Sequence, residues 1–261
     1  MSKIDLRQGD CLEEMDKLIE RGVKVDMILT DPPYGTTACK WDSVIPFEPM
    51  WERVNKLIKP NGAIVLFGSE PFSSALRMSN IKNYKYDWVW AKERGTGYAR
   101  ANKQPMRITE SISVFYQSQP YYNSLGEKLD KPYKHALPIY GSGSDGGPSN
   151  NLTPDGRRIY KTYTHSKKNN LIRIAREDNR KSLHPTQKPV ALLEYLIKTY
   201  TNEGETVLDF TMGSFSTAIA CLNTKRSFIG IEKDAHYFQV GKDRLEKHLL
   251  TLDYRPKVVY N

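Results

Sequence analysis

Both ends of the chain alternate short apolar runs with longer stretches of helical spacing. The apolar runs are rich in β-forming residues and have the length of buried strands: Val25–Leu29, Ala63–Phe67, Thr206–Asp209 and Phe228–Ile231. The stretches between them place apolar residues on one helical face, at 11–20, 47–58, 71–80, 188–201, 214–223 and 234–249. This alternation predicts an α/β fold, a doubly wound and mostly parallel sheet with helices on both faces. Ligands bind such sheets beyond the carboxyl ends of the strands.

The middle of the chain breaks this pattern. Hydrophobic periodicity fades over 118–182, which includes the run Gly-Ser-Gly-Ser-Asp-Gly-Gly-Pro at 141–148. We expect an inserted, loop-rich region at 118–182, and one domain formed by 1–117 together with 183–261. The segments 84–91 and 111–117 are expected to be the last strands before the insertion.

The net charge of +9 is concentrated in the same part of the chain. From Arg94 to Lys181 there are 16 Lys and Arg against 7 Asp and Glu, whereas the rest of the chain carries 23 of each. Eight tyrosines are interleaved with these basic residues. A neutral body with a basic middle section favours contact with a polyanion, although a solvated basic face would have the same composition. Four residues here are of the types that read base edges: Arg157, Arg158, Asn169 and Asn170.

Several protein classes do not fit the sequence. No apolar run is long enough for a membrane span, and the first residues have no apolar core of a secretory leader, so we expect a cytoplasmic location. Cys11, Cys39 and Cys221 lie far apart and form no Cys-x-x-Cys pair. This spacing predicts reduced thiols and no metal site.

The most specific local pattern is Asp31-Pro32-Pro33-Tyr34, directly after the predicted strand at 25–29. The exocyclic amine of a nucleobase is a poor nucleophile because its lone pair is delocalised into the ring. The Asp31 carboxylate and a backbone carbonyl held by Pro32 can both accept from that amine, which localises the lone pair for attack. Tyr34 offers a flat face for an extruded base, a contact worth about 1–3 kcal/mol. A turn with a capping Asp is the alternative.

Two segments nearer the C-terminus predict a cofactor that carries a nucleoside. Within Val207–Ala218 a strand leads through Gly213 to a helix start, where Ser214 can cap the helix. After a further short segment, Glu232 ends the next strand, and an acidic residue at that place can accept from both hydroxyls of a ribose.

Two more polar turns precede predicted helices. Asp10 and Cys11 follow the strand Ile4–Arg7, and Asp10 is equally suited to be a helix N-cap. The segment His-Pro-Thr-Gln-Lys-Pro supplies donors and a cation near a helix N-terminus, which suits a carboxylate, although a capped basic turn would look the same. The residues concerned are Thr186, Gln187 and Lys188.

The order of these motifs resembles the β group of amino-methyltransferases that act on DNA, the permuted class whose catalytic motif precedes its cofactor motif. The motifs run Gly-Asp-Cys-Leu, Asp-Pro-Pro-Tyr, His-Pro-Thr-Gln-Lys-Pro, Asp-Phe-Thr-Met-Gly-Ser and Gly-Ile-Glu, and the resemblance covers nearly everything outside the middle region. It implies a Rossmann-like methyltransferase fold, S-adenosyl-L-methionine as cofactor, and a middle region that recognises the target in double-stranded DNA.

The same resemblance assigns the site. The catalytic residues would be Asp31, Pro32, Pro33 and Tyr34. The residues that hold the cofactor would be Asp10 and Cys11 at its adenine, Glu232 at its ribose, and Thr186, Gln187, Lys188, Asp209, Gly213 and Ser214 around its methionine end. The implied reaction methylates the exocyclic amino nitrogen of a flipped base. Adenine is favoured because cytosine-N4 enzymes more often carry Ser where this chain has Asp31. A homodimer and a cognate restriction endonuclease are further partners that such enzymes can have.

One position departs from the family pattern. The usual cofactor turn reads Asp-Pro-Phe-x-Gly-Ser-Gly-Thr, whereas here Phe215 replaces the second glycine. A side chain at that position either meets the ligand or changes the turn, and we expect a local change because Gly213 remains.

Rival functions are separated by residue type. Methylation of a cytosine ring carbon uses a Pro-Cys pair, and a zinc nucleobase deaminase uses His-x-Glu with Pro-Cys-x-x-Cys; neither pattern occurs. Three other methylation targets fit the sequence: cytosine N4, an RNA amine and a protein glutamine. A catalytically weak DNA-binding relative is a further alternative, and Phe215 is the best support for it.

Overall fold

A computed structural model describes residues 2–36, 42–136, 157–176 and 187–261. They form two compact units, one of Met1–Asn123 with Asn170–Asn261 and one of Ser124–Asn169. Each unit is described by itself below.

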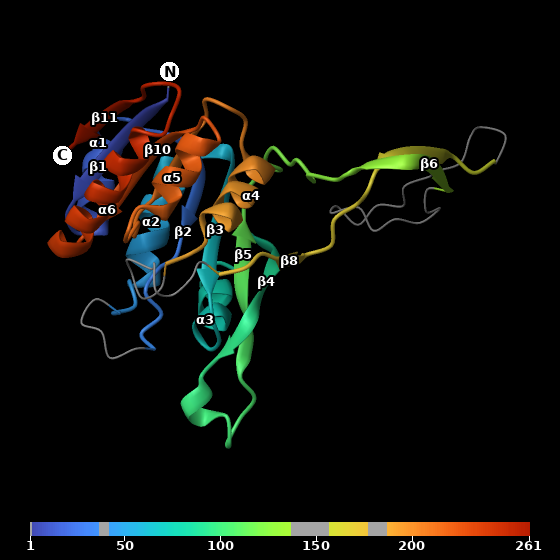
Figure 1. The fold of residues 1–261 in the computed structure, drawn as a ribbon, viewed down its shortest axis with the longest axis horizontal. Helices are drawn as coiled ribbons and strands as arrows, with labels where there is room; N and C mark the ends of the chain where they lie inside the picture. Colours follow the sequence, from blue (N-terminus) through green and yellow to red (C-terminus); the bar gives the residue numbers. More distant parts are fainter. Residues whose placement is uncertain (1, 37–41, 137–156, 177–186) are drawn as a thin grey trace. The chain divides into compact units, whose positions relative to one another are not determined.

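The larger unit is built on a nine-stranded sheet with the order β11-β1-β10-β9-β2-β3-β5-β4-β8 (Figure 1). Only β5 runs against the other described strands, pairing antiparallel with β3 and β4. The strands are Lys3–Gln8 (β1), Val25–Thr30 (β2), Ile58–Gly68 (β3), Tyr84–Thr96 (β4), Arg107–Phe115 (β5), Leu171–Arg173 (β8), Thr206–Asp209 (β9), Ser227–Glu232 (β10) and Lys257–Tyr260 (β11). The predicted sheet, mostly parallel, is confirmed.

Helices cover both faces of this sheet because its central strands are apolar on both sides. Along β2, Ile28 belongs to a core with the helices that precede β4, whereas Met27 and Leu29 belong to a core with the helices that follow β8. The first group is α1 (Cys11–Glu20), α2 (Phe47–Leu57) and α3 (Phe72–Ser79); the second is α4 (Val190–Tyr200), α5 (Ser216–Asn223) and α6 (Ala235–Leu249). The fold is therefore doubly wound, as the sequence predicts.

At the centre of the sheet, β2 and β9 lie side by side, and the chain continues from them towards opposite edges of the sheet. From β2 the chain continues to β3 on one side, and from β9 it continues to β10 on the other. Because β2 and β9 are parallel neighbours, their carboxyl ends open together into one crevice. This topology brings residues near 31 beside residues near 210.

The expected strands at 84–91 and 111–117 correspond to β4 and β5, but the two strands extend further towards each other in sequence. They form a long ribbon that ends in a short 3-10 turn, η1 (Tyr98–Arg100). Gly97 starts that turn with a φ of 92°, a conformation that costs glycine little. The segment between Arg94 and Lys103 thus contains the last residues of β4 and the turn at the end of this ribbon.

The smaller unit is a two-stranded antiparallel ribbon, β6 (Lys128–Ala136) with β7 (Tyr160–His165). Its described residues include none that is buried. Tyr133 and Tyr163 stack across the strands with ring centroids 5.4 Å apart. The predicted insertion, 118–182, extends beyond this unit on both sides, and its end at 182 lies outside the described residues.

None of the helices that the structure describes is long and apolar enough to span a membrane.

Candidate active site

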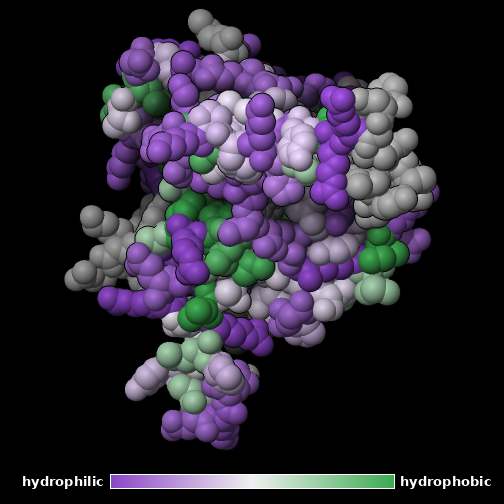
Figure 2. Space-filling model, turned by 90° about the vertical axis from the view of Figure 1, so that its right-hand side faces the viewer, coloured by the Kyte–Doolittle hydropathy of each residue, from purple (hydrophilic) through white to green (hydrophobic). Residues whose placement is uncertain are grey.

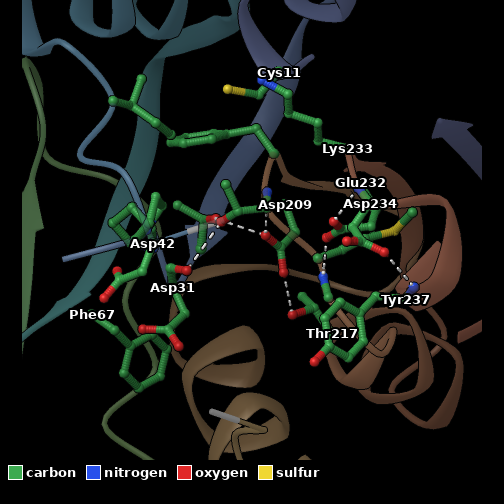
Figure 3. Close-up of a pocket in the computed structure, with 18 of the residues that line it drawn as sticks. Cys11, Asp31, Asp42, Phe67, Asp209, Thr217, Glu232, Lys233, Asp234 and Tyr237 are labelled. Carbon is green, nitrogen blue, oxygen red and sulfur yellow. Dashed lines mark hydrogen bonds between the residues drawn. The ribbon is translucent and has the colours of Figure 1, made fainter. Parts of the chain in front are cut away.

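A cavity of about 680 Å³ opens at the carboxyl ends of β1, β2, β9 and β10 (Figure 3). It is lined by every predicted site residue within the described part of the chain: Asp10, Cys11, Asp31, Pro32, Pro33, Tyr34, Gln187, Lys188, Asp209, Gly213, Ser214 and Glu232. Thr186 lies outside the described residues. Five separate sequence segments thus meet at one cavity.

Asp31 lies at one side of this cavity, and both of its carboxylate oxygens have a partner. Tyr34 donates its hydroxyl to Oδ1, and the Lys188 ammonium pairs with Oδ2. Burial raises the pKa of Asp31, against the lowering effect of Lys188. The Tyr34 ring also packs against Phe72, with centroids 5.0 Å apart. The pKa of the Tyr34 hydroxyl is raised by burial and by Asp31, so it remains a hydrogen-bond donor.

Asp209 joins the end of β2 to the turn after β9. Its Oδ1 accepts from Thr30 Oγ1 at 2.7 Å, and its Oδ2 accepts from Thr217 Oγ1 at 2.6 Å. Thr211 Oγ1 in turn donates to the main-chain oxygen of Asp31 at 3.1 Å. Burial raises the pKa of Asp209 to about 6. These bonds hold the ends of β2 and β9 together, across 180 residues of sequence.

Glu232 ends β10 on the other side of the cavity. Its Oε2 accepts from the backbone nitrogen of Gly213 at 2.8 Å, and its Oε1 accepts from that of Asp234 at 2.8 Å. Burial raises the pKa of the Glu232 carboxyl. Glu232 therefore fixes the glycine of the turn while its carboxylate borders the cavity, close to Asp234 and Tyr237 in Figure 3.

Asp10 and Cys11 form the wall contributed by β1 and α1. Asp10 is the N-cap of α1, accepting from Leu12 N at 2.9 Å, and it also pairs with Lys233 at 3.1 Å. Asp10 is thus a helix N-cap, which was the alternative prediction, and it also lines the cavity. Burial raises the pKa of Cys11 to about 12, which keeps its thiol neutral. Cys221 is a buried thiol in α5, and Cys39 lies outside the described residues.

Gln187 and Ser214 close the side of the cavity near α4 and α5. Ser214 Oγ donates to Gln187 Oε1 at 3.0 Å. Arg244, on α6, donates to the main-chain oxygen of Ser214 at 2.9 Å and to Ser216 Oγ at 2.8 Å. Arg244 was not predicted from the sequence. Its two hydrogen bonds hold the turn at Ser214 and Ser216 in place.

Three more residues near Asp31 were not predicted from the sequence: Glu110, Lys92 and Phe67. Glu110 on β5 lies with Oε2 at 3.4 Å from Lys188 Nζ, and it also pairs with Lys92 on β4. Burial alone would raise the pKa of Glu110, but Lys188 and Lys92 outweigh it and lower that pKa. Phe67, at the end of β3, lies under the Lys188 ammonium at 5.1 Å. Lys92 and Glu110 lie just outside the predicted strands 84–91 and 111–117, although the observed β4 and β5 include them, so the sequence contains no signal for their pairing.

Lys188 is therefore shared between two carboxylates. Its side chain is 8 % exposed, so its charge has little access to water. Burial disfavours that charge, but Asp31 and Glu110 more than compensate and raise the pKa of Lys188. The charge of Asp31, which follows β2, is thus balanced together with those of residues from β4, β5 and the segment before α4.

Phe215 has a backbone conformation that glycine adopts more readily than other residues. Its φ is 65°, in the left-handed region, and its side chain is fully buried. The ring packs edge-on against Phe238 at 5.5 Å, and a Cβ on Gly241 would lie 2.3 Å from it. The ring thus occupies space left by Gly241 between α5 and α6, and Phe215 is not among the residues that line the cavity. The side chain of Phe215 is thus accommodated between α5 and α6, away from the residues that line the cavity.

Comparison with known proteins places these features in a family. A family model described as DNA methylase, N6_N4_Mtase, matches residues 25–243. The chain is 28% identical over 255 residues to the DNA adenine methyltransferase YhdJ of Escherichia coli K12, covering 91% of this chain and 81% of YhdJ. It is 27% identical over 253 residues to the type II methyltransferase M.HpaI of Haemophilus parainfluenzae, covering 88% and 70%. Its fold matches a crystal structure of an M1.HpyAVI–SAM complex with a TM-score of 0.63, at 27% identity over 92% of this chain and 99% of that one.

Proposed function

Since this chain belongs to the DNA methylase family, whose model matches residues 25–243, we propose that its target is the exocyclic amino nitrogen of a flipped adenine in double-stranded DNA. The chain is a site-specific DNA methyltransferase that uses S-adenosyl-L-methionine. The identity of the base and the roles of the individual residues are the proposal.

One observation carries the residue assignment. Thr211 Oγ1 donates to the main-chain oxygen of Asp31 at 3.1 Å, so the Asp-Pro-Pro-Tyr corner and the turn after β9 form one wall of one cavity. A methyl donor held by the turn and an amine held by the corner can meet only if these two segments converge.

The cavity suits the cofactor by its donors and its size. Its volume of about 680 Å³ lies within the usual range for sites that enclose small molecules. Glu232 offers a carboxylate at the end of β10 for ribose hydroxyls, and Gly213 allows a close approach of the backbone. Asp10 and Cys11 would border the adenine, whereas Gln187 and Ser214 would hold the methionine end. Bound there, S-adenosyl-L-methionine would supply an electrophilic methyl group on a positively charged sulfur.

The residues of the corner act on the amine. Asp31 accepts one N–H of the amine, and the carbonyl held by Pro32 accepts the other, so that the lone pair turns towards the methyl donor. For this, Asp31 exchanges its contact with Lys188 or Tyr34 for the amine, and Glu110 then balances the charge of Lys188. After methylation the nitrogen releases one proton, which the Asp31 carboxylate can accept because burial raises its pKa.

The smaller unit supports contact with DNA outside the cavity. Its described residues include eight lysines and arginines and two acidic residues, with no buried core. Lys167 lies 4.1 Å above the ring of Tyr163, so charge and aromatic surface are combined. A two-stranded ribbon without a core is marginally stable alone, which favours a role in which a phosphate backbone covers it. Of the predicted base-reading residues, Arg157, Arg158 and Asn169 belong to this unit.

Asn170 differs from these three residues, since it belongs to the larger unit and donates from Nδ2 to the main-chain oxygen of Asp87 at 3.3 Å. We therefore assign base reading to the smaller unit. A cytoplasmic location, a homodimer and a cognate restriction endonuclease remain part of the proposal, and the first check on the dimer is the mass of the protein in solution.

The test is product analysis. The protein is incubated with methyl-labelled S-adenosyl-L-methionine and genomic DNA from a strain without DNA methylation, and the DNA is digested to nucleosides for mass spectrometry. We expect label in N6-methyladenine. Label in N4-methylcytosine would show that the target base is cytosine rather than adenine, while the assignment of the site residues would stand. DNA binding without any label would favour the non-enzymatic relative, whose main support, Phe215, lies away from the cavity.

A further inference from the structure

The ribbon of β4 and β5 carries large apolar side chains beyond the cavity. Tyr98 is 85% exposed, Met106 44% and Ile108 50%. We refer to these three residues as the apolar strip. Figure 2 shows hydrophobic and hydrophilic residues side by side at this end of the ribbon, which projects at the bottom of the picture. The catalytic corner does not use these residues.

Ile108 on β5 and Met106 just before it continue the face of the strand that carries Glu110, whereas Tyr98 lies in η1 at the end of the ribbon. Side chains alternate along a strand, so Met106 and Ile108 share the face of Glu110, which pairs with Lys188. At about 3.3 Å per residue, Ile108 lies about 7 Å and Met106 about 13 Å along the strand from Glu110. A base that is flipped out of a duplex to reach Asp31 lies outside the base stack, so the gap that it leaves lies at a distance from the pocket. The strip extends from the pocket on the same face and is therefore placed for contact with that gap.

The opposite face of the ribbon is anchored to the body of the unit. Arg107 donates from Nη1 to Ser69 Oγ at 3.0 Å and to the main-chain oxygen of Glu70 at 3.2 Å. A Cβ on Gly95 would lie 2.8 Å from Met106 Cβ and 3.3 Å from Ile108 Cγ2, so both side chains lie close over the opposite strand. The strip is thus held in place by the ribbon and faces outward.

The charges beside the strip indicate the chemistry of its partner. Arg94 and Lys103 are exposed, and within the described part of the chain neither forms an ion pair. An apolar strip between unpaired cations is complementary to a duplex, whose interior is apolar and whose backbone is anionic.

We propose that the apolar strip is a wedge that enters the base stack beside the target and occupies the space that the flipped base leaves. This inference rests on the proposed function. Methionine and isoleucine are side chains that proteins insert between base steps, and unstacking a step costs a few kcal/mol that such contacts offset. Arg94 and Lys103 then lie where phosphates flank the opened step.

The test compares two duplexes that differ only at the target. The first is a matched duplex with the sequence that the wild-type protein methylates; in the second, an abasic site stands opposite the target base. We expect Met106→Ser/Ile108→Ser to slow single-turnover methylation of the matched duplex by at least about tenfold, which is 1.4 kcal/mol. On the abasic duplex, where the target is already unpaired, its rate should return to near that of the wild type. Tyr98→Ala should show the same pattern.

Leu250→Ser is the matched control, because Leu250 is 78% exposed and follows the far end of α6. It should behave as wild type on both duplexes. Unfolding curves and S-adenosyl-L-methionine affinity should be unchanged in the strip variants, since none of the substituted residues lines the cavity. Equal losses on both duplexes, or no loss on the matched one, would overturn the wedge. Failure of the proposed function would look different, because the wild type would then methylate neither duplex.

Discussion

Replacing Asp31 by Asn tests the catalytic corner with little change of shape. The variant keeps an oxygen that can accept from Tyr34 but loses the negative charge that polarises the amine. Electrostatic stabilisation of this kind is worth about 2.7–4 kcal/mol, so we expect methyl transfer to fall by about 10²–10³-fold. Lys188 retains a counter-ion in Glu110, 3.4 Å away, and the fold should survive.

The assay is single-turnover methylation at saturating S-adenosyl-L-methionine and DNA, with separate binding measurements for both. Asp26→Asn is the matched control, because Asp26 lies on β2, the strand that leads to Asp31, and pairs with Lys59 outside the cavity. Affinities should stay close to wild type in both variants, and only Asp31→Asn should lose rate. A rate for Asp31→Asn within about tenfold of wild type would refute the assignment of the amine acceptor.

Three further predictions concern stability and DNA affinity. Because the pKa of Asp209 is raised from 3.8 to about 6, its folded form binds more protons than its unfolded form, so its contribution to stability falls as pH rises through this range. Relative to Asp209→Asn, wild-type stability in urea titrations should decline by about 2.4 kcal/mol between pH 4 and 7, and a constant difference would contradict this. Phe215→Gly should lower the free energy of unfolding by about 2–4 kcal/mol, since the lost packing exceeds the relieved strain, while S-adenosyl-L-methionine affinity in calorimetry is retained. Gly241→Ala should destabilise the wild type but not this variant. DNA affinity, measured by fluorescence anisotropy, should fall by orders of magnitude from about 50 to 200 mM salt, and a flat response would contradict the role of the basic region.

The sequence predicted the fold well where local patterns decide it. Runs such as Val25–Leu29 are apolar on both faces, which indicates a central parallel strand, and helical spacing identified the layers around it. The antiparallel direction of β5 and the length of its ribbon with β4 were not predicted. Polar and basic residues from Lys92 to Met106 conceal a strand pairing that depends on long-range register.

The candidate site shows the same division between local and distant information. Motif order and strand ends were sufficient to place Asp31 and Asp209 at one crevice, because the topology of a doubly wound sheet brings such ends together. The partners of those carboxylates could not be predicted. Lys188 reaches Asp31 across 157 residues, and Glu110 has no motif around it. The tolerance of Phe215 likewise depends on Gly241, a residue on another helix.

The central claim is that the corner at Asp31 and the turn at Gly213 serve one ligand and one base. A crystal structure with S-adenosyl-L-methionine tests it most directly. We predict that the ribose lies beside Glu232 and that the sulfur-bound methyl group points towards the Asp31 carboxylate. Electron density for the ligand outside this cavity, or a methyl group directed away from Asp31, would contradict the account.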